Sequence, residues 1–298
     1  MPGVVLPQPG RATAGRRRGR TGHTVRVIQG AGDGLLDELS ALALEAARAA
    51  GELLLARPDH LPVDTKSSPT DVVTAMDRRS EELLVSRLLG ARPDDGLLGE
   101  EGGQRLGTSG VRWVVDPLDG TVNYLYGHPV WAVSVAAEVD GQPAVGVVHC
   151  PAVAETYVGV RGRGAWRLAG DGRRALQVGR PPELAAALVG TGFGYTEQRR
   201  QSQGRVIGAV LPRVRDVRRV GAASVDLCWV ADGRLDAYWE KGLKPWDLAA
   251  GQVVATAAGA QVMGLRGMPA GEELVLAAAP GLAGPLHDLL CDLGADED

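Results

Sequence analysis

Acidic side chains occur at four places where apolar segments begin or end, and their spacing suits metal chemistry. The segment WVVDPLDGTVN, residues 113–123, ends an apolar run with Asp116 and Asp119. The other acidic groups lie in LGEEGG, residues 98–103, in PWD, residues 245–247, and at Asp77. An Asp-x-x-Asp turn can direct both carboxylates into one cleft, where oxygen ligands favour Mg²⁺. Two such ions about 4 Å apart can assist an in-line phosphoryl displacement.

The residues that follow these aspartates add groups of the same kind. The carbonyl oxygen of Leu118 is available as a further oxygen ligand. Gly120 and Thr121 can present backbone N–H groups, and a helix that begins there would favour a phosphate. The stretch therefore has the groups that a metal-assisted reaction of a phosphate ester needs.

Each acidic residue also has a structural explanation, and spacing alone leaves both open. Asp119-Gly120 is a common turn pair, and Asp247 can cap the helix that it precedes. Asp77 ends a capping box that begins at Thr74, so a cap is as well supported as a catalytic role. Glu100-Glu101 fits a solvated loop. The metal hypothesis depends on these groups lying together in the fold.

The elements that position these residues change along the chain from helices to strands and then to an alternation. Leucines and alanines at helical spacing predict a helix over residues 35–56 that Asp33 caps, and Thr74 begins a second helix that Gly90 ends. Apolar runs predict strands at 111–116, 131–139 and 143–150, with a hairpin turn at Asp140-Gly141. The last third alternates, with strands at 187–193, 234–240 and 273–278 and helices at 201–214, 223–232, 246–260 and from Pro280. This order indicates stacked layers of helix and sheet.

The composition is that of a globular protein and gives no case for a nucleic-acid or membrane partner. The 298 residues are 45% hydrophobic and 23% charged, with a formal net charge of −4. That charge does not favour binding to nucleic acid or an anionic membrane. Aromatic residues are too sparse for a base-stacking surface, and no segment is long and apolar enough to span a bilayer.

The first 30 residues and the cysteines give information about the cellular compartment of the protein. Residues 1–30 hold Arg16-Arg17-Arg18 among glycine, proline and threonine, which predicts a disordered basic tail. They lack the apolar stretch of roughly 7–15 residues that a secretory signal needs. Cys150, Cys228 and Cys291 are an odd, widely spaced set and indicate a reducing compartment. We therefore expect a cytoplasmic protein.

Four of these segments, in this order, resemble the motifs of the inositol monophosphatase family, whose superfamily includes fructose-1,6-bisphosphatase. The family core, Trp-x-x-Asp-Pro-[Ile/Leu]-Asp-Gly-Thr-x-Asn, is matched without a gap from Trp113 to Asn123. The other matches are Lys-Ser to Asp at 66–77, Gly-Glu-Glu at 99–101 and the Trp-Asp-x-Ala-Ala-Gly segment at 242–251. Four motifs in order are far more specific than one. The resemblance covers roughly residues 33–290.

The resemblance implies a Mg²⁺-dependent phosphomonoesterase with two or three ions per active site. The first ion would be bound by Glu100, Asp116, Asp119 and the Leu118 carbonyl. The second would be bound by Asp116, Asp119 and Asp247. The glycines after Glu100 predict a loose loop behind this ligand.

The resemblance also assigns catalytic and substrate-binding roles. Asp77 and Thr121 would orient the attacking water, with Glu100 as its acid/base partner. Glu240 would bind substrate hydroxyls, and the amides of Gly120 and Thr121 would hold the phosphate. The full set of implied substrate-binding residues is Glu100, Leu118, Asp119, Gly120, Thr121, Gly221, Ala222, Ala223, Glu240 and Asp247.

The fold implied by the resemblance is an α/β alternating αβαβα layered sandwich, assembled as a homodimer and sensitive to lithium. After the tail, the catalytic domain would span residues 31–298, with an N-terminal α+β part at about 31–180 and a C-terminal α/β part at about 181–298.

The expected substrate is inositol 1-phosphate. Histidinol phosphate and fructose 1,6-bisphosphate are the alternatives within the family. No basic cluster for a second phosphate is evident near the motifs, where Arg161, Arg163 and Lys244 are the nearest candidates. A non-catalytic binding protein of the same fold is the alternative from another class.

Overall fold

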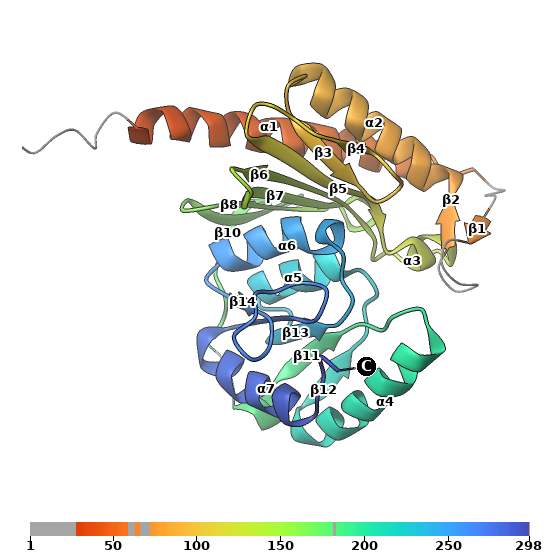
Figure 1. The fold of residues 1–298 in the computed structure, drawn as a ribbon, viewed down its shortest axis with the longest axis vertical. Helices are drawn as coiled ribbons and strands as arrows, with labels where there is room; N and C mark the ends of the chain where they lie inside the picture. Colours follow the sequence, from red (N-terminus) through yellow and green to blue (C-terminus); the bar gives the residue numbers. More distant parts are fainter. Residues whose placement is uncertain (1–27, 59–62, 66–71, 181–182, 298) are drawn as a thin grey trace, which may run out of the picture.

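Helices and sheets alternate in five layers in the computed structural model, which describes residues 28–58, 63–65, 72–180 and 183–297. Helices α1 and α2 cover one face of an eight-stranded sheet, and α5 and α6 lie between that sheet and a five-stranded one (Figure 1). Helices α4 and α7 cover the far side of the second sheet. The predicted αβαβα sandwich is confirmed. The predicted tail, as far as residue 27, and motif residues 66–71 lie outside the described residues.

The eight-stranded sheet has the order β10-β9-β8-β7-β6-β5-β3-β4, and its only parallel pair among the described strands is β3 with β5. Its strands are β3 Gly96–Gly99, β4 Gln104–Arg105, β5 Val111–Asp119, β6 Ala132–Val139, β7 Gln142–Cys150, β8 Glu155–Val160, β9 Gly164–Ala169 and β10 Gly172–Leu176. A small separate pair, β1 Val63–Thr65 and β2 Val72–Thr74, precedes it. The predicted hairpin turn is present, since Asp140 and Gly141 both have positive φ between β6 and β7.

The two N-terminal helices differ at their ends from the sequence prediction. Helix α1 spans Ile28–Leu55, so Asp33 lies inside it and residues 28–30 belong to the helix and not to a tail. Helix α2 spans Ala75–Ala91, so Gly90 lies in its last turn and Arg92 caps it. The capping box of Thr74 and Asp77 is confirmed. Side-chain hydrogen bonds of a cap depend on near neighbours, whereas a helix end also depends on what the helix packs against.

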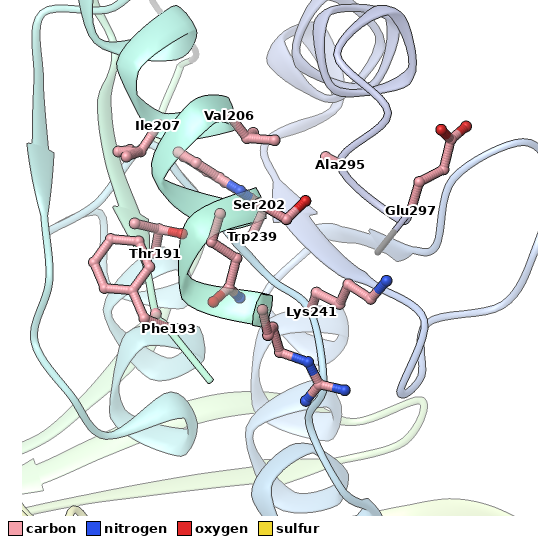
Figure 2. A pocket seen from close by; sticks show the side chains of 12 residues that line it. Thr191, Phe193, Ser202, Val206, Ile207, Trp239, Lys241, Ala295 and Glu297 are labelled. Carbon is pink, nitrogen blue, oxygen red and sulfur yellow. The ribbon is translucent and has the colours of Figure 1, made fainter. Parts of the chain in front are cut away.

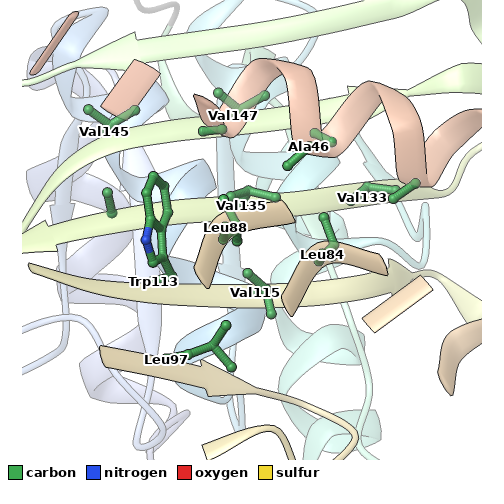
Figure 3. Packing of buried hydrophobic residues seen from close by; sticks show 14 of the residues in the cluster. Ala46, Leu84, Leu88, Leu97, Trp113, Val115, Val133, Val135, Val145 and Val147 are labelled. Carbon is green, nitrogen blue, oxygen red and sulfur yellow. The ribbon is translucent and has the colours of Figure 1, made fainter. Parts of the chain in front are cut away.

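Strand β5 is apolar on both sides because helices cover both faces of the sheet. Trp113 and Val115 point into a core shared with α1 and α2, where Leu84 and Leu88 pack close by (Figure 3). Val114 points the other way, into a core shared with α5 and α6. The buried strand is thereby held from both faces, and its acidic end is fixed in place.

The five-stranded sheet has the order β12-β11-β13-β15-β14 and is built from the last third of the chain. Its strands are β11 Leu188–Thr191, β12 Asp216–Arg218, β13 Ala237–Glu240, β14 Gln261–Met263 and β15 Val275–Ala278. The helices are α3 Thr121–Leu125, α4 Glu197–Val210, α5 Ala223–Ala231, α6 Pro245–Ala257 and α7 Pro280–Asp292. Helix α4 begins four residues before the predicted 201 because Thr196 caps it. Among the described helices, none has the length and apolar character needed to cross a bilayer.

Helix α6 approaches the first sheet very closely, and two glycines make this possible. A Cβ on Gly146 of β7 would lie 2.3 Å from the carbonyl oxygen of Ala250. A Cβ on Gly159 of β8 would lie 2.6 Å from Cα of Val254. This close packing fixes the position of α6 against the sheet. It thereby also fixes the position of the first turn of α6, which contains Asp247.

Candidate active site

One cleft collects most of the side chains that the motifs predict. It lies where β5, the loop after β3, the end of β13 and the first turns of α5 and α6 meet. The predicted residues that line it are Glu100, Asp116, Leu118, Asp119, Gly120, Thr121, Gly221, Ala223, Glu240 and Asp247. Groups separated by up to 147 positions in the sequence are thus brought to one place.

The two aspartates of the core motif sit on either side of an irregularity in β5. The register of β5 with β6 shifts between Asp116 and Asp119, where Pro117 has no N–H to donate. Ser80 Oγ donates a hydrogen bond of 2.9 Å to the Pro117 carbonyl, and the Leu118 amide donates one of 2.9 Å to Asp116 Oδ1. These two hydrogen bonds fix the irregular segment of β5, which we call the β5 bulge, at the Pro117 carbonyl and at the Leu118 amide.

Asp119 is bound by a residue that the sequence reasoning missed. The backbone N–H and Oγ of Ser224, in the first turn of α5, donate to Asp119 Oδ2 at 2.8 and 2.5 Å. Both bonds favour the ionised carboxylate, although burial still raises the pKa of Asp119 above its ordinary value. The sequence signal was slight: a serine directly after the Gly221–Ala223 segment.

Asp77 caps α2 and also contacts a predicted site residue. Its Oδ2 accepts a hydrogen bond of 2.9 Å from the backbone N–H of Thr74, which is part of the capping box, and one of 2.5 Å from the Thr74 hydroxyl. Its Oδ1 lies 3.0 Å from Oγ1 of Thr121. Burial raises the pKa of Asp77, and the Thr74 bonds oppose that rise. Cap and site contact use different oxygens, so they do not compete.

Asp247 likewise combines a cap with a place in the cleft. It is the third residue of α6, and its Oδ2 accepts a 2.6 Å hydrogen bond from the Lys244 amide. Burial and then the charges of Asp119 and Glu100 raise the pKa of Asp247 well above its usual range. The other carboxylate oxygen is left for the cleft.

The acidic residues of the cleft raise one another's pKa values. Burial is the main cause at Asp116, followed by the charges of Glu100, Asp119 and Asp247. A side-chain hydrogen bond with Glu100 raises the pKa of Asp116 further. Among the ion pairs of the described residues, none reaches Asp116, Asp119 or Asp247.

Glu240 has a separate place, at the end of β13. Its Oε2 accepts a 2.5 Å hydrogen bond from the Tyr238 hydroxyl, and the backbone of Gly192 packs directly against its carboxylate. Burial raises the pKa of Glu240 to about 7, although Tyr238 and Arg219 both oppose the rise. Near neutral pH this group can therefore accept or donate a hydrogen bond to a hydroxyl.

The sequence profile of the Inositol monophosphatase family matches residues 35–294. The chain belongs to the inositol monophosphatase family. It is 47% identical over 230 residues to a protein of Mycobacterium tuberculosis named inositol-1-monophosphatase SuhB, which covers 75% of this chain and 79% of that protein. It is 40% identical over 235 residues to a Pseudomonas aeruginosa protein named Nus factor SuhB, with 76% and 85% covered. The solved inositol monophosphatase of Anabaena superposes with a TM-score of 0.75 at 32% identity, covering 86% of this chain and 96% of that one.

Two residues implied by the family motifs lie outside the cleft lining. Ala222 is buried, and its methyl group lies beneath Gly120, where an added Cβ would meet it at 3.3 Å. Gly120 has a φ of +89°, which favours glycine and begins the short helix α3. Asp77 is also fully buried and reaches the cleft only through Thr121.

The structure adds positive charge that the sequence analysis did not find near the family motifs. Arg199, from α4, and Arg219, which follows β12, both line the cleft. Arg219 lowers the pKa of Asp119 and of Glu240 by its charge. By contrast, Arg161 and Arg163 lie at the β8–β9 turn, where Arg163 pairs with Asp37. Lys244, the third candidate from the sequence, does line the cleft and pairs with Glu272.

A smaller neighbouring cavity shares some lining residues with the acidic cleft but has an apolar side (Figure 2). Its apolar side is formed by Val206, Ile207 and Trp239, and Arg199 and Lys241 belong to both cavities. None of the predicted metal ligands lines it. The acidic cleft is therefore the place where the family motifs converge.

Proposed function

We propose that this chain is a Mg²⁺-dependent phosphomonoesterase that hydrolyses inositol 1-phosphate to inositol and phosphate. The observation that carries the proposal is the cluster of buried carboxyl groups on one cleft, with raised pKa values at Asp116, Asp119 and Asp247. Family membership adds the reaction class, and the M. tuberculosis relative bears the corresponding name.

The donor set fits a hard divalent cation. All the available donors are oxygens, and mutual repulsion among ionised carboxylates is relieved by a bound cation. Glu100, Asp116, Asp119, Asp247 and the Leu118 carbonyl would hold it. Among the described residues, no three acidic, histidine or cysteine side chains already surround one point closely enough to bind a metal. When bound, the metal would supply a Lewis acid for the phosphoryl group and lower the pKa of water.

The protein's own groups around the phosphate have defined tasks in this proposal. The Asp77 carboxyl and the Thr121 hydroxyl, whose oxygens lie 3.0 Å apart, would orient the attacking water, with Glu100 as its acid/base partner. The Gly120 and Thr121 amides would bind the phosphate at the start of α3. Glu240 would bind hydroxyls of the leaving alcohol. Its pKa of about 7 allows it both directions of hydrogen bonding.

Phosphate release from inositol 1-phosphate, followed with and without Mg²⁺, tests this proposal. We expect turnover to need Mg²⁺ and to stop after EDTA, and to be restored when Mg²⁺ is added in excess. Unchanged turnover in EDTA would contradict the metal mechanism. Lithium is expected to inhibit, and light scattering of the purified protein would test the proposed homodimer.

A bisphosphate such as fructose 1,6-bisphosphate is a second candidate substrate, because Arg199 and Arg219 both line the cleft. Their charges suit a second anionic group and disfavour the ammonium group of histidinol phosphate. A panel of kcat/KM values for inositol 1-phosphate, fructose 1,6-bisphosphate and histidinol phosphate decides among them. We expect histidinol phosphate to be the poorest of the three.

A role as a binding partner is the candidate from another class, because the P. aeruginosa relative is named a Nus factor. Asp119→Asn separates the two roles. A catalyst loses turnover while it stays folded, whereas binding to a transcription partner would survive the change.

A further inference from the structure

Helix α2 presents one polar face to three separate segments of the active site. Asp77 contacts Thr121 at the start of α3, and Ser80 donates to the Pro117 carbonyl in the β5 bulge. Glu81, the next residue on this face, reaches the loop that contains Glu100. The first two contacts reach residues of the family motif at 113–123. The third is made by a residue to which no role has yet been assigned.

Glu81 is a buried carboxylate that holds two amides of one loop. Its side chain belongs to a residue only 5% exposed. Its Oε2 accepts a 2.8 Å hydrogen bond from the Glu101 amide, and its Oε1 accepts one of 2.8 Å from the Gly103 amide. These amides lie on either side of Gly102, directly after the predicted ligand Glu100. The loop therefore closes around a carboxylate from a different element.

The glycines of this loop make the close approach possible. A Cβ on Gly99 would lie 2.4 Å from Glu81 Oε2, and a Cβ on Gly103 would lie 2.8 Å from Oε1. No larger residue fits at either place without displacing the carboxylate. The glycines from which the sequence predicted a loose loop therefore also leave the space that the Glu81 carboxyl group occupies.

Part of the shape of this loop is fixed by its own backbone. It closes the β3–β4 hairpin through one backbone hydrogen bond of 2.6 Å, from the Gly99 amide to the Gly103 carbonyl. Gly102 has a φ of +112°, which a flexible glycine adopts freely. The two hydrogen bonds from the Glu101 and Gly103 amides to the Glu81 carboxyl group restrict the backbone on both sides of Gly102. Glu100 lies between this clamp and the end of β3.

We propose that Glu81 is a positioning residue that sets the place of Glu100, and through it the affinity of the cleft for a divalent cation. The inference rests on the proposed function in that Glu100 is taken as a metal ligand. Glu81 itself does not face the cleft. It acts only by clamping the loop on which Glu100 is carried.

The test compares Glu81→Gln with Glu82→Gln. Gln keeps the size of Glu81 but replaces one acceptor oxygen with an NH₂ group, which must face one of the two amides. Glu82 is the next residue of α2, is exposed, and loses the same charge, but the hydrogen bonds to the loop amides run to Glu81 and not to Glu82. Both proteins would be measured without metal by amide hydrogen exchange of residues 99–103, and then by Mn²⁺ titration with the free-ion EPR signal.

We expect Glu81→Gln to speed exchange at Glu101 and Gly103 by about tenfold or more. The Mn²⁺ dissociation constant should rise by roughly 10- to 100-fold, which is usual when the support of a ligand is lost. Glu82→Gln should change neither. Equal exchange rates in the loop for the parent and Glu81→Gln would overturn the proposal. So would unchanged Mn²⁺ affinity despite faster exchange.

A second variant changes the contact between Glu81 and the loop at a loop residue, and it serves if Glu81→Gln does not fold. Gly103→Ala would push the carboxylate away without changing α2, and Gly90→Ala, with open space around it, is its control. Gly103→Ala should raise the Mn²⁺ dissociation constant, and Gly90→Ala should not. A parent protein that binds no Mn²⁺ would count against the proposed function, while the exchange comparison would still decide the role of Glu81.

Discussion

Glu240→Gln should make the protein more stable at neutral and alkaline pH while it weakens recognition of the substrate alcohol. Glu240 is largely buried, and burial is the main reason that its pKa rises from 4.5 to about 7. An acid with a raised pKa in the folded state holds a proton that the unfolded chain releases. The stability of the folded state therefore falls as pH rises from about 4.5 toward 7.

The size of this effect follows from the two pKa values. Proton linkage between 4.5 and about 7 gives a loss of about 2.5 kcal/mol in the free energy of unfolding from pH 5 to pH 8. Gln does not titrate, and its amide oxygen can still accept the Tyr238 hydroxyl. The variant should therefore keep the hydrogen bond and lose the pH-dependent penalty.

The assay is urea denaturation in EDTA at pH 5 and pH 8, for the parent, Glu240→Gln and Glu82→Gln. The other buried acids titrate in all three proteins, so the difference between the parent and Glu240→Gln isolates one group. We expect the variant to gain about 2.5 kcal/mol relative to the parent between the two pH values. The exposed Glu82 should give no such gain. If Glu240→Gln follows the parent at both pH values, the argument from burial is refuted.

Three further predictions concern the ligand cluster and the packing behind it. Asp119→Asn should lower kcat by more than about 100-fold while circular dichroism stays that of the parent, and retained turnover would contradict its role. Ser224→Ala removes the hydroxyl that donates to Asp119 at 2.5 Å, so the Mg²⁺ concentration for half-maximal activity should rise roughly 10-fold or more. Gly146→Ala places a Cβ 2.3 Å from the Ala250 carbonyl oxygen and should cost about 1–3 kcal/mol. Thermal denaturation would show this as a lower Tm, and an unchanged Tm would contradict the close packing of α6.

Local signals in the sequence were the most reliable guides to the fold. The capping box at Thr74 and Asp77 and the Asp140-Gly141 turn were both found as predicted, because their hydrogen bonds and dihedral angles involve neighbours in the chain. The apolar run before Asp116 was correctly assigned to a strand. Helix ends were less well predicted, as with α1 and α4, because the start of a helix also depends on tertiary packing and capping.

For the candidate site, too, the sequence decides some features and the tertiary structure decides others. Residue order alone supplied the acidic motifs, their resemblance to the family and the set of oxygen donors. It left open whether Asp77 and Asp247 are caps or site residues, and the fold answers that each is a cap and also contacts or lines the cleft.

Only the tertiary structure could reveal the groups that hold and tune these donors. Ser224 meets Asp119 across 105 positions of sequence, and Glu81 clamps a loop 20 residues away. Arg219 enters the cleft from outside every motif. Burial then raises the pKa of Asp116 and Glu240. The sequence by itself determined which chemical groups are available. The distances between these groups, and the removal of water around them, arise only when the layers pack. Distance determines which hydrogen bonds form, and removal of water determines which groups stay charged.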